Sequence, residues 1–305
     1  MIRIATRHSE LALRQARLVQ RLLAARGLTS ELVTYETTGD RRLDVPLAEI
    51  GTKGLFTREL EDDLAAGRVD CCVHSLKDLP TEDPPGLCVA ARLEREDPRD
   101  ALVAAVGVSA RSVGDLPPRA RVGTSSLRRR AQLLALRPDL NVVELRGNVP
   151  TRVRKVMDGE VQAAVLAAAG LVRLGLEHHI SARLEPPAWI SAAGQGAIAV
   201  QVRADDAQTM ALFGSLDHAP TTRAVTAERA FLGALQGGCQ VPIGAWASTG
   251  AGSSERLYGI VAHPSGDPVI RGECEIGADP HASGVELATE LRGRGADAIL
   301  GSLRG

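Results

Sequence analysis

The chain has 305 residues, of which 44% are hydrophobic, so it is long enough to form two or three domains with cores of their own. Its formal net charge of −1 excludes a strong electrostatic bias of the whole molecule. No stretch reaches the roughly 18 apolar residues of a membrane helix, and the start, MIRIATRHSE, lacks the apolar core of a signal peptide. We therefore expect a soluble protein that does not bind membranes.

The first part of the chain alternates strand-like and helix-like hydrophobic patterns. The elements predicted there are strand Ile2–Ala5, helix Glu10–Arg26, strand Leu32–Tyr35, helix Leu55–Ala66, strand Val69–Val73 and a strand near Leu87–Ala91. The stretch 37–52 has no clear periodicity and contains glycines and a proline, which predicts a long loop. The charged run Glu94–Asp100 is a candidate linker.

A second alternating unit follows the charged run, and a smaller α+β unit ends the chain. The elements predicted for the second unit are strands Ala101–Val106, Arg121–Gly123, Val142–Leu145 and Ala163–Leu166 and helices Ser126–Leu136 and Val149–Met157. The elements predicted after it are strand Ala197–Val202, helix Thr222–Leu235, strands Ile243–Ala247, Arg256–Ala262 and Val269–Glu275, and one helix over Ala282–Leu300. Alternating strands and helices predict parallel sheets, and the strand at 197–202 is suited to return to the first unit.

Polar residues follow the predicted strand Val69–Val73 at once, in the order His74-Ser75-Leu76-Lys77-Asp78. Ligands bind just beyond the carboxyl ends of strands in open α/β sheets, so Lys77 and Asp78 are the first candidates for chemistry. The alternative is a solvated turn that holds a salt bridge.

Two strand-to-helix junctions share a pattern in which a Thr is followed by a Ser at a predicted helix N-cap. They are Thr6 to Ser9 and Thr124 to Ser126. Free N–H groups at such helix starts bind anions, which favours a hinged, two-lobed binding fold with a cleft. The alternative is that both are ordinary capped helices.

The stretch 119–155 contains ten basic residues and only two acidic ones. Arg128 and Arg129 lie in the first turn of a predicted helix, where they oppose the helix dipole, so we expect a compensating anion nearby. The stretch contains no aromatic residue for base stacking, which favours a small polyanionic ligand over nucleic acid. A solvated basic face is the remaining alternative.

The five cysteines form no CxxC pair, and the histidines have no ligand spacing, so we predict neither a disulfide framework nor a metal site. This cysteine usage favours the cytoplasm. Cys239 follows two glycines and is either a reactive, exposed thiol or an inert one.

Eight motifs, taken in order, resemble the porphobilinogen deaminase (hydroxymethylbilane synthase) family. They are ATRHSELAL, IGTKGLFTREL, VHSLKDLP, EREDPRDA, GTSSLRRR, LRGNVPTR, GQGA and GGCQVPIG. The resemblance runs from Ile2 to about Ala247. It implies an ammonia-releasing transferase of haem and porphyrin biosynthesis that joins four porphobilinogen molecules and releases hydroxymethylbilane by hydrolysis. The resemblance also implies a monomer, and we expect no nucleic-acid partner.

The resemblance also implies roles for individual residues. Asp78 corresponds to the catalytic aspartate, and Cys239 corresponds to the cysteine that carries a covalent dipyrromethane cofactor through a thioether. The positions that match residues holding the cofactor and the growing anionic oligopyrrole are Arg7, Ser9, Lys53, Ser75, Lys77, Thr124, Ser126, Arg128, Arg129, Arg146, Gly147, Arg152 and Gln195. The loop over 37–52 is expected to cover the cleft.

The predicted fold is therefore α/β, with two hinged lobes like those of periplasmic binding proteins and a smaller α+β C-terminal domain. The predicted boundaries are 1–95 with the return strand 197–214, then 100–192, then 219–305 with the cofactor cysteine. A two-lobed protein that binds small anions without catalysis is the alternative function. It explains the helix starts and the arginines, but it does not require Asp78 or Cys239.

Overall fold

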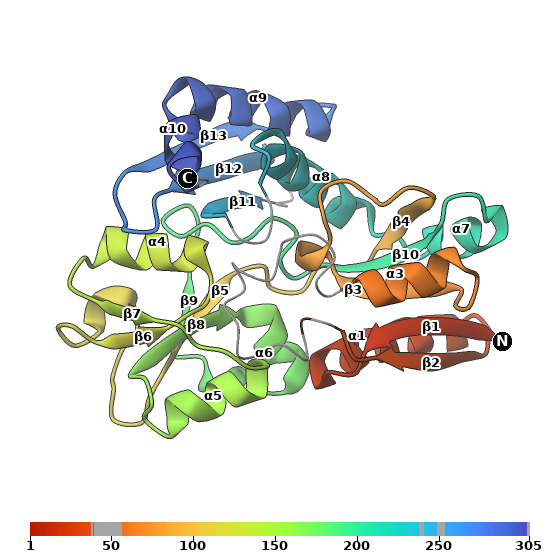
Figure 1. Cartoon of the computed structure of the whole chain (residues 1–305), viewed down its shortest axis with the longest axis horizontal. Helices are drawn as coiled ribbons and strands as arrows, with labels where there is room; N and C mark the ends of the chain where they lie inside the picture. The colour runs from red at the N-terminus through yellow and green to blue at the C-terminus, as the bar shows by residue number, and fades with distance from the viewer. Residues whose placement is uncertain (38, 40–56, 238–240, 249–253, 304–305) are drawn as a thin grey trace. The chain divides into compact units, whose positions relative to one another are not determined.

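The structure is a computed structural model that describes residues 1–37, 39, 57–237, 241–248 and 254–303. The chain divides into two compact units. Unit 1 comprises Met1–Glu96 and Gly196–Thr222, and unit 2 comprises Asp97–Gln195 and Arg223–Gly305. Unit 1 has one five-stranded sheet, whereas unit 2 has a five-stranded and a three-stranded sheet (Figure 1). The predicted α/β class, with a smaller α+β part at the C-terminal end, is confirmed.

Unit 1 is built on a sheet with the strand order β2-β1-β3-β10-β4. Its strands are β1 (Ile2–Arg7), β2 (Ser30–Tyr35), β3 (Cys71–Ser75), β4 (Leu87–Arg92) and β10 (Ile198–Arg203), and its helices are α1 (Glu10–Ala24), α3 (Arg58–Ala65) and α7 (Ala207–Gly214). Successive strand residues face opposite sides, so Cys71 packs in the cluster with α1 and α7, while Cys72 packs in the cluster with α3. Both faces of the sheet are thus covered by helices.

Two expectations for unit 1 need correction. The strand predicted to end at Val73 continues through His74 and Ser75, because these residues pair with Ala199 and Ile198 of β10. The sheet is mixed rather than parallel, since β10 runs antiparallel to both β3 and β4. The prediction that the strand near 197–202 returns to the first sheet is confirmed.

The five-stranded sheet of unit 2 has the order β7-β6-β8-β5-β9. Its strands are β5 (Asp100–Ala104), β6 (Arg121–Gly123), β7 (Asn141–Val143), β8 (Ala163–Ala167) and β9 (Ala182–Leu184), and its helices are α4 (Leu127–Leu136), α5 (Val149–Met157) and α6 (Ala168–Leu174). Helix α4 packs on one face, and α5 and α6 pack on the other. This sheet is also mixed, because β5 runs antiparallel to β8 and β9, and the sequence pattern missed α6 and β9.

The three-stranded sheet consists of antiparallel β11 (Ile243–Ala247), β12 (Arg256–Ala262) and β13 (Val269–Glu275). Helix α8 (Ala219–Ala234) and helices α9 (Pro280–Gly293) and α10 (Ala296–Gly301) cover one face, and residues of α4 pack against the other. One helix was predicted over Ala282–Leu300. The structure has two, because the chain turns at Gly295, whose φ of 102° is not helical.

Candidate active site

A small polar pocket of about 60 Å³ lies in unit 1 at the ends of β1 and β3 and the start of α1. Four of the predicted site residues line it, namely Arg7, Ser9, Ser75 and Asp78. Three further polar side chains complete the wall, namely Gln15, Thr57 and His74. The pocket therefore unites one arginine, one carboxylate and several hydrogen-bonding groups within a single unit.

A short 3-10 helix, Leu76–Asp78, carries Lys77 and Asp78 directly after β3. Leu76 is fully buried, and its backbone N–H donates to the carbonyl of Ala197 at 3.0 Å. The buried side chain and this hydrogen bond attach the turn to the sheet, and Lys77 and Asp78 lie half-buried at the end of the strand. The polar residues after the strand thus form a half-buried turn built on the sheet, rather than the solvated turn that was the alternative.

His74 is a buried residue of the pocket wall, with an exposed fraction of 5%. Its Nε2 lies 3.2 Å from Oε1 of Gln201, whose Nε2 in turn donates to Oε1 of Glu61 at 3.3 Å. Burial lowers the pKa of His74 to about 4, although the hydrogen bond with Gln201 opposes this shift. Burial likewise raises the pKa of Glu61. His74 is therefore neutral at pH 7.

The start of α1 provides the pocket's hydrogen-bonding edge. Ser9 is the N-cap, as predicted, and its hydroxyl accepts from the backbone N–H of Ala12 at 3.4 Å. Gln15, one turn further along, donates from Nε2 to the hydroxyl of Ser75 at 2.8 Å. Gln15 itself is buried, so the amide holds the end of β3 against the helix.

The second predicted helix start lies in unit 2. Ser126 is the N-cap of α4, as predicted, and its hydroxyl accepts from the backbone N–H of Arg129 at 3.4 Å. The hydroxyl of Thr124 accepts from the N–H of Ser126 at 3.2 Å, and the backbone N–H of Thr124 donates to the carbonyl of Val143. These bonds fix the strand-to-helix turn from which the arginines begin.

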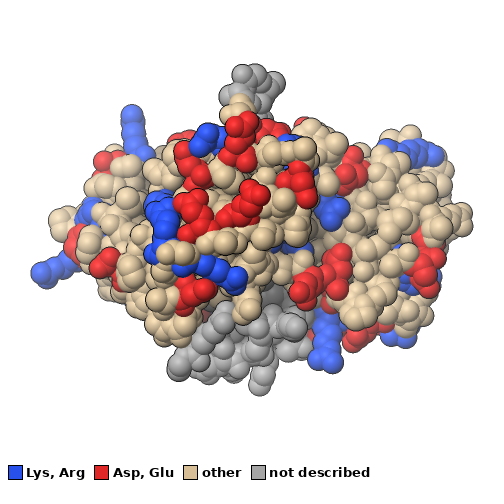
Figure 2. Space-filling model, turned by 90° about the horizontal axis from the view of Figure 1, so that it is seen from above, with Lys and Arg blue, Asp and Glu red and all other residues tan. Residues whose placement is uncertain are grey.

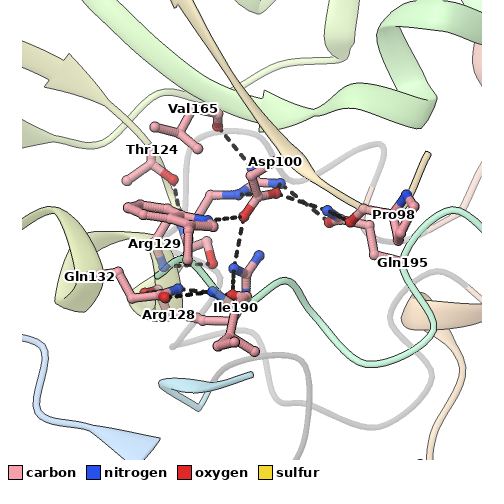
Figure 3. A network of polar contacts seen from close by, with 11 residues as sticks. Pro98, Asp100, Thr124, Arg128, Arg129, Gln132, Val165, Ile190 and Gln195 are labelled. Atoms are coloured by element: carbon pink, nitrogen blue, oxygen red, sulfur yellow. Dashed lines mark hydrogen bonds and ion pairs between the residues drawn. The ribbon is translucent and has the colours of Figure 1, made fainter. Parts of the chain in front are cut away.

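Arg128 and Arg129 both converge on the fully buried carboxylate of Asp100 (Figure 3). Arg128 donates from Nη1 to Oδ2 at 2.8 Å, and Arg129 donates from Nε and Nη2 to Oδ1 at 3.1 and 2.7 Å. Trp189 Nε1 donates to Oδ2 at 2.8 Å, and Gln195 Nε2 donates to Oδ1 at 2.9 Å. Burial raises the pKa of Asp100, but the two guanidinium groups outweigh it and hold that pKa well below its usual value.

Asp100 was assigned to a charged linker from the sequence, and this was wrong, because it is the first residue of β5. It is also the compensating anion that the two arginines at the start of α4 led us to expect. Sequence reasoning did not find Trp189 or Gln132 as parts of this network. Gln132 donates from Nε2 to the carbonyl of Ile190 at 2.9 Å, and the same carbonyl accepts from Nη1 of Arg128 at 2.7 Å (Figure 3).

The remaining predicted residues of unit 2 lie around the start of α5. Asn148 is the N-cap and accepts from the N–H of Thr151 at 2.9 Å, while Arg152 donates from Nε to the carbonyl of Gly147 at 2.7 Å. Gly147 has a φ of 115°, and a Cβ there would lie 2.8 Å from Cγ2 of Thr151, so only glycine fits. Arg146 lies 3.3 Å from Glu144.

Two further arginines of the basic stretch have partners within the fold. Arg137 pairs with Asp139 at 2.7 Å, and Arg130 donates to the carbonyl of Val142. On the face of the molecule shown in Figure 2, basic and acidic side chains are interspersed, without a continuous basic surface among the described residues. Within the same residues, no cluster of His, Cys, Asp and Glu is arranged to hold a metal ion.

The predicted site residues thus form two sets. Arg7, Ser9, Ser75, Lys77 and Asp78 belong to unit 1. Thr124, Ser126, Arg128, Arg129, Arg146, Gly147, Arg152 and Gln195 belong to unit 2. Lys53, Cys239 and nearly all of the predicted covering loop lie outside the described residues. No helix in the described part of the chain has the length and apolar character to cross a membrane.

Comparison with known proteins identifies the family. Residues 2–211 match the model for the porphobilinogen deaminase dipyrromethane cofactor-binding domain, and residues 222–293 match that for the porphobilinogen deaminase C-terminal domain. The chain belongs to the porphobilinogen deaminase family. It is 50% identical to a porphobilinogen deaminase of Paracoccus denitrificans over 96% of this chain and 94% of the relative. It is 45% identical to one of Brevibacillus brevis over 98% and 96% of the two chains.

Solved structures with a similar chain trace include a periplasmic substrate-binding protein of an ABC transporter from Coxiella burnetii. It covers 75% of this chain and 97% of its own at a TM-score of 0.45 and 16% identity. The VFT2 domain of BvgS from Bordetella pertussis covers 70% and 85%, also at a TM-score of 0.45, with 15% identity.

Proposed function

We propose that this chain is a porphobilinogen deaminase (hydroxymethylbilane synthase). It joins four porphobilinogen molecules head to tail, releases ammonia at each condensation, and delivers hydroxymethylbilane by hydrolysis for tetrapyrrole biosynthesis. The observation that carries the proposal is the match of residues 2–211 and 222–293 to the two domains of this family. The polar pocket with Asp78 on its wall supports it.

Asp78 is the catalytic group in this proposal. When ammonia leaves porphobilinogen, the carbon–nitrogen bond breaks with its electron pair on nitrogen, and a positive charge spreads over the pyrrole. A carboxylate that the fold holds in place stabilises such a cation better than freely reorienting water does. The anchored turn Leu76–Asp78 supports this role, because it holds the carboxylate at the pocket without a long flexible loop. The charge disappears when the new carbon–carbon bond forms and the attacked ring loses a proton.

The dipyrromethane cofactor, when bound, supplies the pyrrole carbon to which the first substrate is joined. Cys239 carries it through a thioether in this proposal. Acetate and propionate groups make both the cofactor and the growing chain anionic, and the donors of unit 2 fit such a group, because two buried guanidiniums share a single carboxylate. Residues proposed to hold the cofactor and the oligopyrrole are Arg7, Ser9, Lys53, Ser75, Lys77, Thr124, Ser126, Arg128, Arg129, Arg146, Gly147, Arg152 and Gln195.

We further propose that the enzyme acts as a cytoplasmic monomer. The four cysteines in the described part of the chain are all free thiols, which is typical of a reducing compartment. Light scattering of the purified protein checks the oligomeric state, because a monomer has the mass of one 32.1 kDa chain with its cofactor.

The decisive variant for this function is Asp78→Asn, which removes the charge and keeps the size. We expect turnover of porphobilinogen to fall by about 100-fold or more, since an electrostatic group aimed at a developing charge is worth about that much. The thermal unfolding midpoint should stay close to that of the wild type.

The matched control for Asp78→Asn is Asp83→Asn, which removes an exposed carboxylate shortly after the same turn. It should retain wild-type turnover. Near-normal turnover of Asp78→Asn would remove Asp78 from the mechanism.

A further inference from the structure

The carboxylate of Asp100 is the most heavily hydrogen-bonded side chain of the network in Figure 3. It accepts five hydrogen bonds, from Arg128, Arg129, Trp189 and Gln195, and its exposed fraction is 0%. Arg128 and Arg129 are themselves only 4% and 7% exposed. Two guanidiniums and one carboxylate leave a net positive charge in a nearly closed site, and such a charge is costly unless an anion compensates it.

The two arginines use their donors differently. Arg129 donates from Nε and Nη2 to Asp100 and from Nη1 to the carbonyl of Val165 at 2.9 Å, so each of its nitrogens is engaged. Arg128 uses only Nη1, toward Asp100 and the carbonyl of Ile190. Within the described residues, neither Nε nor Nη2 of Arg128 makes a hydrogen bond, and neither is a fully buried unsatisfied atom.

The open edge of Arg128 has the geometry that a carboxylate requires. Nε and one N–H of Nη2 point in the same direction, and this side of a guanidinium binds a carboxylate through two parallel hydrogen bonds. The orientation of that edge depends on what holds Nη1, which is Oδ2 of Asp100 at 2.8 Å. Trp189 donates to the same oxygen at 2.8 Å and so fixes the carboxylate itself.

We propose that Asp100 is a positioning residue, which holds Arg128 with its Nε and Nη2 edge open toward a carboxylate of the pyrrole chain. This revises the role of Arg129 among the residues proposed to hold the oligopyrrole: because all of its nitrogens are engaged, it serves as the fixed counter-charge of Asp100 and not as a direct ligand. This inference rests on the proposed function for the identity of the anion, but the network itself can be tested separately.

The sharpest test is the Michaelis constant of Asp100→Asn for porphobilinogen. If only net charge mattered, removal of a negative charge beside two arginines would strengthen the binding of an anion. If Asp100 positions Arg128, binding should instead weaken, because Arg128 loses its fixed orientation in the variant. We then expect KM to rise about tenfold or more. KM does not depend on how much of the preparation is folded, so a merely structural role would leave it unchanged.

Asp139→Asn is the matched control, because Asp139 pairs with Arg137 just beyond the other end of the same helix and its side chain is 39% exposed. It should change KM less than twofold.

Trp189→Phe is the milder second variant if Asp100→Asn does not fold. It removes one donor to the carboxylate, and we expect a two- to fivefold increase in KM. Unchanged KM in every folded variant of Asp100 and Trp189 would overturn the proposal.

A double-mutant cycle with Arg128→Gln tests whether Asp100 acts through Arg128. In the Arg128→Gln background, Asp100→Asn should raise KM by less than twofold, because the group that it positions is already absent. If the two substitutions multiply instead, Asp100 acts by another route and the proposal is wrong.

The state of the hydrogen-bond network can also be measured without an activity assay, by NMR of the indole N–H groups, because the chain has only two tryptophans. In a Trp246→Phe background, the indole N–H of Trp189 gives a single NMR signal. We expect Asp100→Asn to shift this signal and to speed its hydrogen exchange, and porphobilinogen to shift it only while Arg128 is present. An unaltered signal in Asp100→Asn, or an equal ligand shift in Arg128→Gln, would contradict the proposal. Wild-type protein that binds porphobilinogen but does not consume it would refute the proposed function alone.

Discussion

Charge in the pocket of unit 1 is set by single residues. Arg7 and Asp78 line it together with His74, whose imidazole is held neutral by burial. Nε2 of His74 forms a hydrogen bond with Gln201, which in turn donates a hydrogen bond to Glu61. A neutral imidazole therefore adds no second positive charge to that of Arg7 beside Asp78, which favours the proposed stabilisation of a cation by this carboxylate.

This burial predicts a dependence of stability on pH. The pKa of His74 is about 4 in the folded protein, below its ordinary value of 6.5. Between these values the unfolded chain takes up a proton that the folded chain does not, so the free energy of unfolding falls as pH is lowered from 6.5 to 4. The loss attributable to His74 amounts to about 3 kcal/mol. Asp100 acts in a lower pH range, because its pKa is depressed below the ordinary aspartate value of 3.8 and its contribution to stability is therefore lost only as the pH falls below that value.

Chemical denaturation at pH 7 and at pH 4.5 measures this effect. His74→Gln should lose most of the difference between the two pH values, whereas His218→Gln, which replaces a half-exposed histidine of the same unit, should retain it. An unaltered difference in His74→Gln would show that other groups cause the pH dependence.

The residue scale also shows what a sequence can predict about a site. Two arginines in the first turn of a helix predicted a nearby anion, and Asp100 is that anion. Its position was missed because the run Glu94–Asp100 looks like a solvated linker, and composition does not distinguish an exposed aspartate from one that begins a buried strand. The role of Trp189 could not be predicted from the sequence either, because only the tertiary fold brings its indole N–H to Asp100.

At the scale of elements, the chain segment that precedes β10 is confined by close backbone contact. Gly196 has a φ of 88°, and a Cβ on it would lie 2.3 Å from the carbonyl oxygen of Glu96. The same two residues are joined by a hydrogen bond from the N–H of Glu96 to the carbonyl of Gly196 at 3.1 Å. A side chain at this position would therefore push apart two backbone segments at the edge of unit 1.

We expect Gly196→Ala to lower the free energy of unfolding by about 3 kcal/mol or more, as the sum of left-handed strain and overpacking. Gly86→Ala is the matched control in the same unit, since Gly86 has a φ of 79° but nothing within 4 Å of its Cβ position. It should lose only the conformational part, about 1 kcal/mol. Equal losses in urea denaturation would mean that contact with Glu96 is unimportant.

Element positions were largely predictable, but strand directions were not. Helix Val149–Met157 and strands Ile243–Ala247, Arg256–Ala262 and Val269–Glu275 have the predicted bounds. Hydrophobic periodicity carries no information on direction, so the antiparallel strands of both larger sheets were expected to be parallel. The last helix was drawn too long because its apolar pattern continues on both sides of Gly295.

At the scale of the whole molecule, each unit contributes a different part of the proposed chemistry. Unit 1 carries the pocket with Asp78, and unit 2 carries the arginines around Asp100. The ordered set of motifs predicted the family, because eight short matches in the same order are far more specific than any one of them. The order of motifs does not report how the side chains are used, which is why Arg128 and Arg129 were treated alike.

The covalent cofactor is the central claim for the whole molecule, and the intact mass of the denatured protein tests it most directly. The chain alone has a mass of 32.1 kDa. We predict an additional mass of two linked pyrrole units, found on the peptide that contains Cys239 and absent from Cys239→Ser. A bare chain that gains neither mass nor activity on incubation with porphobilinogen would contradict the account.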